Sequence, residues 1–210
     1  DRPTGDDVLV IWNRHRWQET FVGAYERAGG KVIVVENGYL GRDFNGSLWY
    51  AMAVGQHNGA GRWPAGDPER RKQLGIEAHE WRKDGEEIVI LASRGMGSEV
   101  CRQPDGWPQH ILTTLKRRTG RPVRVRAHPG PQPSARDTTL SNDLQNAWAA
   151  VTWGSTAGLK AVLMGVPVFY GMPLWIGASA GRHIEQNIEE RFLGDPMPML
   201  DRMATAMWSI

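Results

Sequence analysis

The sequence predicts an α/β fold built on parallel sheets, and three features of the 210-residue chain lead to this prediction. Short, continuous apolar runs recur along it, beginning with VLVIW at residues 8–12 and KVIVV at residues 31–35. Runs of this kind are typical of strands that are buried on both faces of a parallel sheet. Segments with apolar residues at helical spacing separate the runs, and short connections join them, as in right-handed strand–helix–strand units.

The first series of elements occupies residues 1–85. Its expected elements are a strand at 8–12, a helix at 18–28, a strand at 31–35, a long loop at 38–70 and a surface helix at 70–81. The first helix is predicted to end at Gly29 and Gly30, because glycines stop a helix. The long loop is rich in Gly, Asn, Trp and His without a regular period, which is typical of a loop that carries function.

A second series of elements occupies residues 86–210. Its expected elements are strands at 87–92, 123–127, 149–152 and 166–170 and helices at 108–118, 141–147, 156–164, 183–192 and within the last ten residues. Strands that alternate with helices indicate a parallel sheet. The two series therefore predict two Rossmann-like halves whose parallel sheets face each other across a cleft.

The composition is that of an ordinary soluble globular protein, with 40% hydrophobic and 23% charged residues and a net charge of +2. No apolar run approaches the length of a membrane span, so no membrane partner is expected. The single cysteine, Cys101, excludes an internal disulfide and a cysteine-rich zinc site, and it is consistent with the reducing cytoplasm. Neither Asp-x-Asp nor two histidines four residues apart occur, so no metal site is expected.

The motifs of several enzyme classes are absent or incomplete. GMG at residues 95–97 lacks the third glycine of a dinucleotide fingerprint, and the chain has no Walker loop. Residues 177–181 match the Gly-x-Ser-x-Gly of serine hydrolases. That fold requires an acid and then a histidine after the serine, but Asp195 and Asp201 follow the last histidine, His183. A hydrolase is therefore not expected.

Two glycine-bearing turns follow predicted strands and are candidates for binding phosphate. RGMGS at residues 94–98 combines a cation with a backbone that a ligand can approach, and GSTAG at residues 154–158 opens a helix with two hydroxyl groups. Helix N-termini at the carboxyl ends of parallel strands bind phosphate through unpaired N–H groups. The alternative interpretations are a plain tight turn and a plain helix cap. The candidate residues in these turns are Arg94, Gly97, Ser98, Gly154, Ser155 and Thr156.

The stretch RAHPG at residues 126–130 ends a third predicted strand at the same edge of the sheet. Pro129 and Gly130 turn the chain, so we expect the ring of His128 at the open end of the strand. A lone histidine is more often structural than functional, but this one is predicted at the same edge of the sheet as the two turns above. Guanidinium, imidazole, hydroxyl groups and helix dipoles gathered at one edge would neutralise the phosphate of a nucleotide.

A basic segment and an unusual number of tryptophans have two possible explanations. Six Lys and Arg residues lie between Lys116 and Arg126 without an acid among them, and the chain has ten Trp. The segment is either a solvated helix end and turn or a surface that meets the phosphates of a nucleotide or nucleic acid. Most Trp rings are expected in the core, and a minority could stack on a base or a sugar.

Residues 151–170, VTWGSTAGLKAVLMGVPVFY, together with RAHPG at 126–130, resemble the donor-binding half of GT-B glycosyltransferases. They are most similar to the capsular-polysaccharide β-Kdo transferase type. The pattern of that type is basic-x-His-Pro and then Thr-Ser-x-x-Gly-x-Glu-Ala-Leu-x-Gly-x-Pro-Val. Lys160 stands here where that type has Glu.

The N-terminal half carries a second part of the resemblance. VENGYLG at residues 35–41 is similar to the stretch Glu-Asp-Gly-Phe-Leu-Arg, which supplies an active-site carboxylate in that type. Glu36 matches the first acid, whereas Asn37 and Gly41 replace the second acid and the arginine. The chain also looks similar to compact bacteriophage glycosyltransferases that modify hydroxymethylated pyrimidines in DNA.

This resemblance implies a metal-independent glycosyltransferase that needs no cofactor besides its co-substrate, which we expect to be a UDP-sugar. Residues 1–85 would bind the acceptor and residues 86–210 the nucleotide-sugar. Glu36 would act as base or nucleophile and His57 as an alternative base, although each could be structural. The expected acceptor-side residues are His15, Arg14 and Arg16, whose charge suggests an acceptor that bears phosphate.

Three functions stay open from the sequence. The preferred acceptor is a hydroxymethylated pyrimidine in DNA, which would place the protein in the cytoplasm of a bacteriophage's host. The second possibility is a surface polysaccharide or another glycan. The third is a module that binds nucleotide or nucleic acid without catalysis, which the loss of the second acid at Asn37 would explain.

Overall fold

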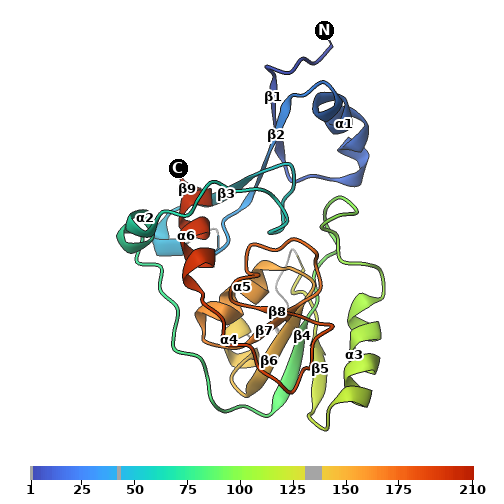
Figure 1. The fold of residues 1–210 in the computed structure, drawn as a ribbon, viewed down its shortest axis with the longest axis vertical. Coiled ribbons are helices and arrows are strands. Elements are labelled where there is room, and N and C mark those ends of the chain that lie inside the picture. The colour runs from blue at the N-terminus through green and yellow to red at the C-terminus, as the bar shows by residue number, and fades with distance from the viewer. Residues whose placement is uncertain (1, 42–43, 131–138) are drawn as a thin grey trace.

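The computed structural model describes residues 2–41, 44–130 and 139–210, and in these residues the chain forms two sheets, A and B (Figure 1). Sheet A and its neighbours comprise β1 (Val8–Trp12), η1 (Arg16–Gln18), α1 (Glu19–Arg27), β2 (Lys31–Asn37), η2 (Phe44–Gly46), β3 (Trp49–Val54), α2 (Pro68–Gln73), α6 (Met197–Ala206) and β9 (Met207–Ser209). Sheet B and its neighbours comprise β4 (Glu87–Leu91), α3 (Trp107–Arg118), β5 (Val123–Arg126), α4 (Leu140–Asp143), β6 (Ala147–Thr152), α5 (Thr156–Leu163), β7 (Val168–Tyr170) and β8 (Arg182–His183). The α/β fold class predicted from the sequence is confirmed.

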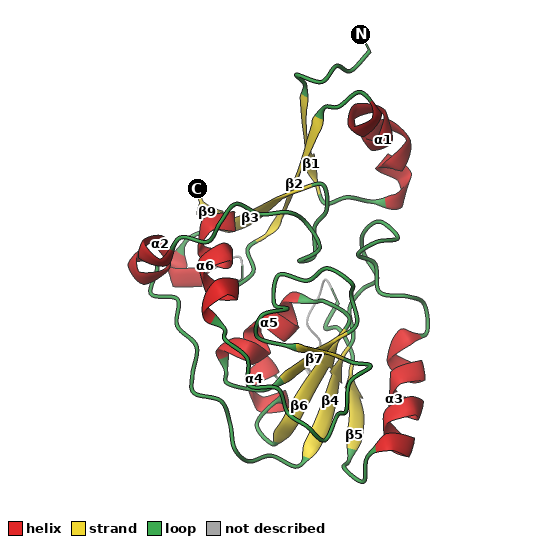
Figure 2. Ribbon diagram, in the orientation of Figure 1, coloured by secondary structure: helices red, strands yellow, loops and turns green. Residues whose placement is uncertain are grey.

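Sheet B is entirely parallel, in the order β5-β4-β6-β7-β8. Its central strands, β4, β6 and β7, are largely buried on both faces, as their continuous apolar runs predict. Ile88 and Ile90 of β4 pack with α3, whereas Val89 and Leu91 pack on the opposite face in the core that contains α5. Figure 2 shows α3 and α5 on opposite sides of this sheet.

Sheet A is mixed, so the expectation of a parallel sheet in this half is wrong. Its order is β1-β2-β3-β9, in which only β1 and β2 are parallel. The strand β3 arises inside the predicted loop 38–70. Its side chains alternate between buried and half-buried, the period of a strand with one covered face, and the surrounding glycines obscured this signal.

The first strand, β1, lies at the edge of sheet A and is not buried on both faces. Val8 and Val10 are 56% and 62% exposed, whereas Ile11, on the other face, packs with Val22 of α1. A continuous apolar run therefore does not by itself distinguish a central strand from an edge strand with one open face.

Three predicted helices are shorter than expected or absent. The helix at 70–81 is replaced by α2, which ends before Gly75, a residue with a φ of +63°. The helix at 141–147 is reduced to α4, which Thr139 caps. Residues 183–192 form no helix, because β8 pairs with β7 and the following turns carry Ile184 and Ile188 into the core.

The C-terminus returns to sheet A. The helix predicted in the last ten residues is α6, which begins earlier, and the chain then pairs β9 with β3. The guanidinium of Arg70 donates hydrogen bonds of 2.7 Å to the carbonyl oxygens of Ala204 and Met207, which ties α2 to this segment. Residues 207–209 therefore lie in the first sheet, although they follow the second half in the sequence. None of the helices in the residues that the structure describes has the length and apolar character that a membrane crossing needs.

We expect Met203→Ala to lower the free energy of unfolding by about 2–5 kcal/mol, the usual cost of removing a large buried side chain. Met203 of α6 is fully buried in the core that links the two sheets. Chemical denaturation would measure the change. The control is Met197→Ala, at a position of α6 that is 38% exposed, and a similar loss there would contradict the central place of Met203.

Candidate functional site

A cavity of about 390 Å³ lies between the two sheets, at the carboxyl ends of β1, β2, β4, β5 and β6. Clefts at the carboxyl ends of parallel strands are the usual ligand sites of open α/β sheets. The first half contributes Asn13, Glu36, Asn37, Gly38, His57 and Asn58 to its wall. The second half contributes Ala92, Ser93, Arg94, Met96, Arg126, His128, Pro129, Leu140, Ser155, Thr156, Ala157 and Lys160.

Glu36, near the end of β2, is a buried carboxyl group in this cavity. It is 8% exposed, and its Oε1 accepts a hydrogen bond of 2.9 Å from the backbone N–H of Asn58. Burial raises its pKa to about 7, although the hydrogen bonds from Asn58 and from the hydroxyl of Tyr39 lower the pKa in part. A carboxyl group with a pKa near neutrality is suited to accept a proton and to release it again.

His57 lies beside Glu36 and is neutral at physiological pH. Burial lowers its pKa to about 4, and electrostatic interactions with His15 and Arg14 contribute to the decrease. Its Nδ1 lies 3.9 Å from the Sγ of Cys101, and its buried Nε2 has no hydrogen-bond partner among the described residues. A neutral imidazole with one unpaired nitrogen can bind a polar ligand group, but its low pKa makes it a weaker base than Glu36.

The opposite wall of the cavity is cationic. Arg94, Arg126 and Lys160 line it. The Nε of Arg126 lies 2.5 Å from Oδ2 of Asp143, so a neighbouring carboxylate balances this charge. Arg94 is exposed and forms no ion pair within the described ranges, so its charge is available to an anionic ligand.

His128, at the end of β5, is held as a hydrogen-bond donor. Its Nδ1 accepts a hydrogen bond of 2.9 Å from the N–H of Gly130, so the neutral ring carries its proton on Nε2. Burial lowers the pKa of His128, and the charges of Arg94 and Arg126 lower it further. The ring is therefore a neutral N–H donor at the edge of a cationic wall.

The N-terminus of α5 completes this wall. Ser155 is its N-cap residue, but the hydroxyl of Ser155 lies 3.0 Å from the Oγ1 of Thr152 and does not cap the helix. The first turn contains no acid, and Thr156 and Ala157 line the cavity. The uncapped N–H groups and the helix dipole favour an anion at this position.

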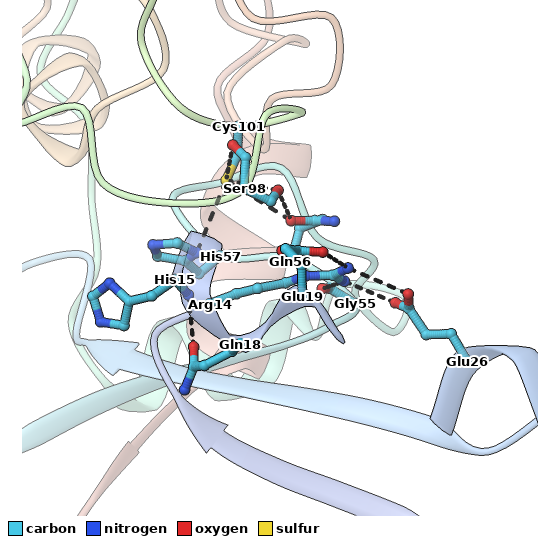
Figure 3. Close-up of polar contacts among 10 residues, drawn as sticks. All are labelled: Arg14, His15, Gln18, Glu19, Glu26, Gly55, Gln56, His57, Ser98 and Cys101. Atoms are coloured by element: carbon cyan, nitrogen blue, oxygen red, sulfur yellow. Dashed lines mark hydrogen bonds and ion pairs between the residues drawn. The ribbon is translucent and has the colours of Figure 1, made fainter. Parts of the chain in front are cut away.

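Three of the predicted donor-side residues do not line the cavity and instead pack next to it. These are Gly97, Ser98 and Gly154. The hydroxyl of Ser98 donates a hydrogen bond of 2.5 Å to the side-chain oxygen of Gln56, which joins the two halves (Figure 3). A Cβ atom on Gly97 would lie 2.5 Å from the Sγ of Cys101, and one on Gly154 would lie 2.5 Å from Cε of Met172. These glycines allow close packing.

The predicted acceptor-side residues Arg14, His15 and Arg16 do not line the cavity. Arg14 is 5% exposed and forms ion pairs of 2.8 Å with Glu19 and 2.7 Å with Glu26, as Figure 3 shows. The ring of His15 stacks near Trp17, and Arg16 is exposed at the start of η1. The position of Arg14 is that of a structural residue, because α1 supplies the carboxylates that pair with it.

Two cavity residues that the sequence did not single out are Asn13 and Asn58. Both have a left-handed backbone, with φ angles of 51° and 56°. Asn13 follows β1 directly, and Asn58 donates to Glu36. Asparagine adopts this conformation more readily than other residues with side chains, so an Asn after a strand was the available signal.

The two α/β units, with the cavity between them, have the arrangement of the GT-B glycosyltransferase fold. Two solved structures of KpsC from Thermosulfurimonas dismutans are similar to the chain. One, a beta Kdo 2,4 transferase, has 16% sequence identity and a TM-score of 0.59 over 96% of this chain and 80% of that chain. The other, a beta Kdo 2,7 transferase, has 16% identity and a TM-score of 0.60 over 98% and 79%. No family model and no curated protein matches the sequence.

The raised pKa of Glu36 predicts a pH-dependent stability. Between its ordinary pKa of 4.5 and its folded value of about 7, the unfolded chain loses this proton first, so stability falls as the pH rises through this interval. Gln cannot ionise, so we expect Glu36→Gln to be more stable than the wild type at pH 8, by up to about 3 kcal/mol, and similar to it at pH 4.

Urea unfolding at several pH values between 4 and 8 would measure this difference. Glu99→Gln, at an exposed position, is the control and should show no comparable gain at pH 8. A Glu36→Gln variant whose stability follows that of the wild type across the whole interval would contradict the burial of an ionisable carboxyl group.

Proposed function

We propose that the protein is a glycosyltransferase that moves a sugar from a nucleotide-sugar to an acceptor hydroxyl group. The observation that carries the proposal is the arrangement of the cavity walls: Glu36, with a pKa of about 7, faces a wall made of cations, an N–H donor and a helix N-terminus. The likeness to KpsC supports the fold in which this chemistry would occur.

The cationic wall would bind the leaving group. Arg94, the Nε2–H of His128 and the N-terminus of α5 line the cavity and would hold the phosphate of a nucleotide, which we propose to be that of a UDP-sugar. As the bond between the anomeric carbon and the phosphate oxygen breaks, the oxygen keeps the electron pair. Positive charge and N–H groups stabilise the negative charge that develops there.

Glu36 would act from the opposite wall. As a base, its carboxylate takes the proton of the acceptor hydroxyl while the acceptor oxygen forms the new bond to the anomeric carbon. As a nucleophile, it would form that bond itself and release the sugar to the acceptor in a second step. Either role requires the ionised carboxylate, and a pKa of about 7 leaves it partly ionised at neutral pH.

For the acceptor, we propose the hydroxyl group of a glycan. The first-half wall presents the amides of Asn13, Asn37 and Asn58 and the neutral ring of His57, and none of the described residues that line it is Lys or Arg. Amide groups pair with hydroxyl groups as both donors and acceptors. The KpsC structures are described as Kdo transferases, which is consistent with a sugar acceptor.

A hydroxymethylated pyrimidine in DNA, the acceptor preferred from the sequence, has less support. The basic segment lies mainly at the turn between α3 and β5, at the end of sheet B away from sheet A (Figure 1). Arg121 pairs with Glu189 and lies over the ring of Trp148, and Arg124 pairs with Glu87. These arginines therefore serve contacts within the protein.

We expect Glu36→Gln to lower the turnover of sugar transfer at least about a hundredfold, the usual effect of losing a catalytic base or nucleophile, while nucleotide binding is retained. The assay offers a panel of nucleotide-sugars with glycan acceptors and with plain and hydroxymethylated DNA. Released nucleotide and the mass of the acceptor are measured. Glu99→Gln serves as the control.

Sugar found on nucleosides after digestion of the DNA would show that the acceptor is DNA and not a glycan. An absence of transfer from every donor, combined with nucleotide binding, would favour the non-catalytic module. Full turnover by Glu36→Gln would remove Glu36 from the mechanism.

We expect His128→Ala to weaken nucleotide binding about 10- to 100-fold, since a hydrogen bond to a charged phosphate is lost. Calorimetric titration with the nucleoside diphosphate measures the affinity. His79→Ala, an exposed histidine outside the cavity, is the matched control. An unchanged affinity of His128→Ala would exclude this ring from the donor site.

A further inference from the structure

One face of sheet A is open and apolar. The helices α1 and α6 pack on the other face, where Val22 of α1 lies in one core cluster with Val34 of β2, and Met203 of α6 lies in another with Ala51 of β3. The side chains that alternate with these residues along the strands are exposed or half-buried. They include Val8, Val10 and Trp12 of β1, Tyr50 of β3 and Trp208 of β9. An exposed apolar face of this kind indicates a binding surface.

Three aromatic side chains form a row across this open face, and we call Trp12, Tyr50 and Trp208 the aromatic row. The rings of Trp12 and Tyr50 pack edge to face, with their centroids 5.8 Å apart. Tyr50 is paired in register with Trp208 of the neighbouring strand, so these two side chains lie side by side. Trp12 and Trp208 are 46% and 50% exposed, although tryptophan is largely buried in most proteins.

The rings of the aromatic row are held in place although they are exposed. The guanidinium carbon of Arg70 lies 4.2 Å from the ring centroid of Trp208, and the same guanidinium donates to the carbonyl oxygen of Met207. Trp12 and Tyr50 restrict each other through their ring contact. A ligand that packs on these rings would lose less binding free energy to their immobilisation than it would on freely moving side chains.

The aromatic row is continuous with the cavity. Asn13, which lines the cavity, follows Trp12 directly in the sequence. Asn37, another cavity residue, is paired in register with Tyr50. Glu36 points to the covered face of β2 and Asn37 to its open face, and both line the cavity. The wall of the cavity therefore extends around the end of β2 to the aromatic row.

The size and polarity of the open face favour a glycan as its ligand. Strands about 4.8 Å apart, with a rise of about 3.3 Å per residue, give β1, β2, β3 and β9 together a face of roughly 330 Å². This area is well below the roughly 800 Å² that each partner contributes to a stable protein interface. The rings adjoin the amide groups of Asn13 and Asn37, and a sugar offers apolar C–H faces to rings and hydroxyl groups to amides.

We propose that the aromatic row binds the sugar units of the acceptor glycan that lie next to the reacting hydroxyl group. The C–H faces of these units stack on the rings, and their hydroxyl groups pair with Asn13 and Asn37. The acceptor is then a glycan of several units and not a single sugar. This inference rests on the proposed function for its role in transfer, whereas glycan binding by the row can be measured without transfer.

The test is Trp12→Ala, which removes an exposed ring of the row without opening the core. The probes are oligosaccharides of one to four units of glucose, galactose or N-acetylglucosamine, titrated by calorimetry. We expect the affinity for the tetrasaccharide that the wild type binds most tightly to fall about tenfold, because one stacked ring is lost. Trp12→Phe keeps a ring and should restore most of this affinity.

Two further variants complete the design. Trp208→Ala removes a ring from the other end of the row and should weaken binding in the same direction, which keeps the test valid if Trp12→Ala does not fold. Trp17→Ala is the matched control, because Trp17 is 74% exposed in η1 and lies outside the row. It should bind each oligosaccharide as the wild type does.

The transfer assay supplies a second readout. Trp12→Ala should raise the KM for the acceptor, and the increase should be larger for a tetrasaccharide than for a monosaccharide, because only the longer acceptor reaches the row. The Trp17→Ala control should keep the dependence of KM on acceptor length that the wild type shows. An increase in KM that is the same for every acceptor length would overturn the inference.

The outcomes separate this inference from the proposed function. Equal glycan affinity in the wild type and in folded Trp12→Ala would overturn the role of the row, as would a wild type that binds none of the probes, and neither result concerns the transfer reaction itself. A loss of glycan binding in Trp12→Ala, in a protein that transfers no sugar from any donor, would support the row and overturn the proposed function.

Two other ligands are tested with the same variants. Analytical ultracentrifugation shows whether the wild type is a dimer that Trp12→Ala dissociates, in which case the row is an interface between two copies of the chain. Titration with a single-stranded DNA oligonucleotide shows whether the rings stack on bases. Either result, without glycan binding, would overturn the inference.

Discussion

The burial of Glu36 between the two sheets is the constraint on which the rest of the cavity depends. A carboxylate removed from water is unstable unless neighbouring groups compensate its charge. Here the N–H of Asn58 and the hydroxyl of Tyr39 supply part of that compensation, and the pKa still rises to about 7. Neutral His57 beside it adds no counter-charge, so the carboxyl group stays balanced between its two protonation states.

Glu36 stays buried only while the two halves of the chain remain close together. Contacts next to the cavity, between the loops after β3 and β4, hold the halves in place. The hydrogen bond between Ser98 and Gln56 and the approach of His57 to Cys101 join the loop after β4 to the loop after β3. Gly97 lies at this junction, with a φ of +115° and no room for a side chain. The cationic wall is thereby held opposite Glu36 at a separation that admits a ligand.

Much of sheet B was predictable from the sequence, because its central strands are buried on both faces and read as continuous apolar runs. Sheet A was less predictable, since its pairing depends on partners that are distant along the chain. The strand β3 lies in a segment rich in glycine and tryptophan, and β9 pairs with it from the C-terminus. Ile184 and Ile188 have helical spacing, yet pairing of β8 with β7 directs that segment along the sheet.

The sequence by itself determined which chemical groups stand at the ends of the strands: Glu36, Arg94, His128 and the hydroxyl groups that open α5. Only the tertiary structure decided which of them share a cavity and which serve packing. Asn13 and Arg14 are adjacent in the sequence, yet Asn13 lines the cavity while Arg14 is buried against Glu19 and Glu26. The physical reason is that local sequence sets the chemistry of a side chain, whereas its direction follows from the backbone turn and from ion partners supplied by another element.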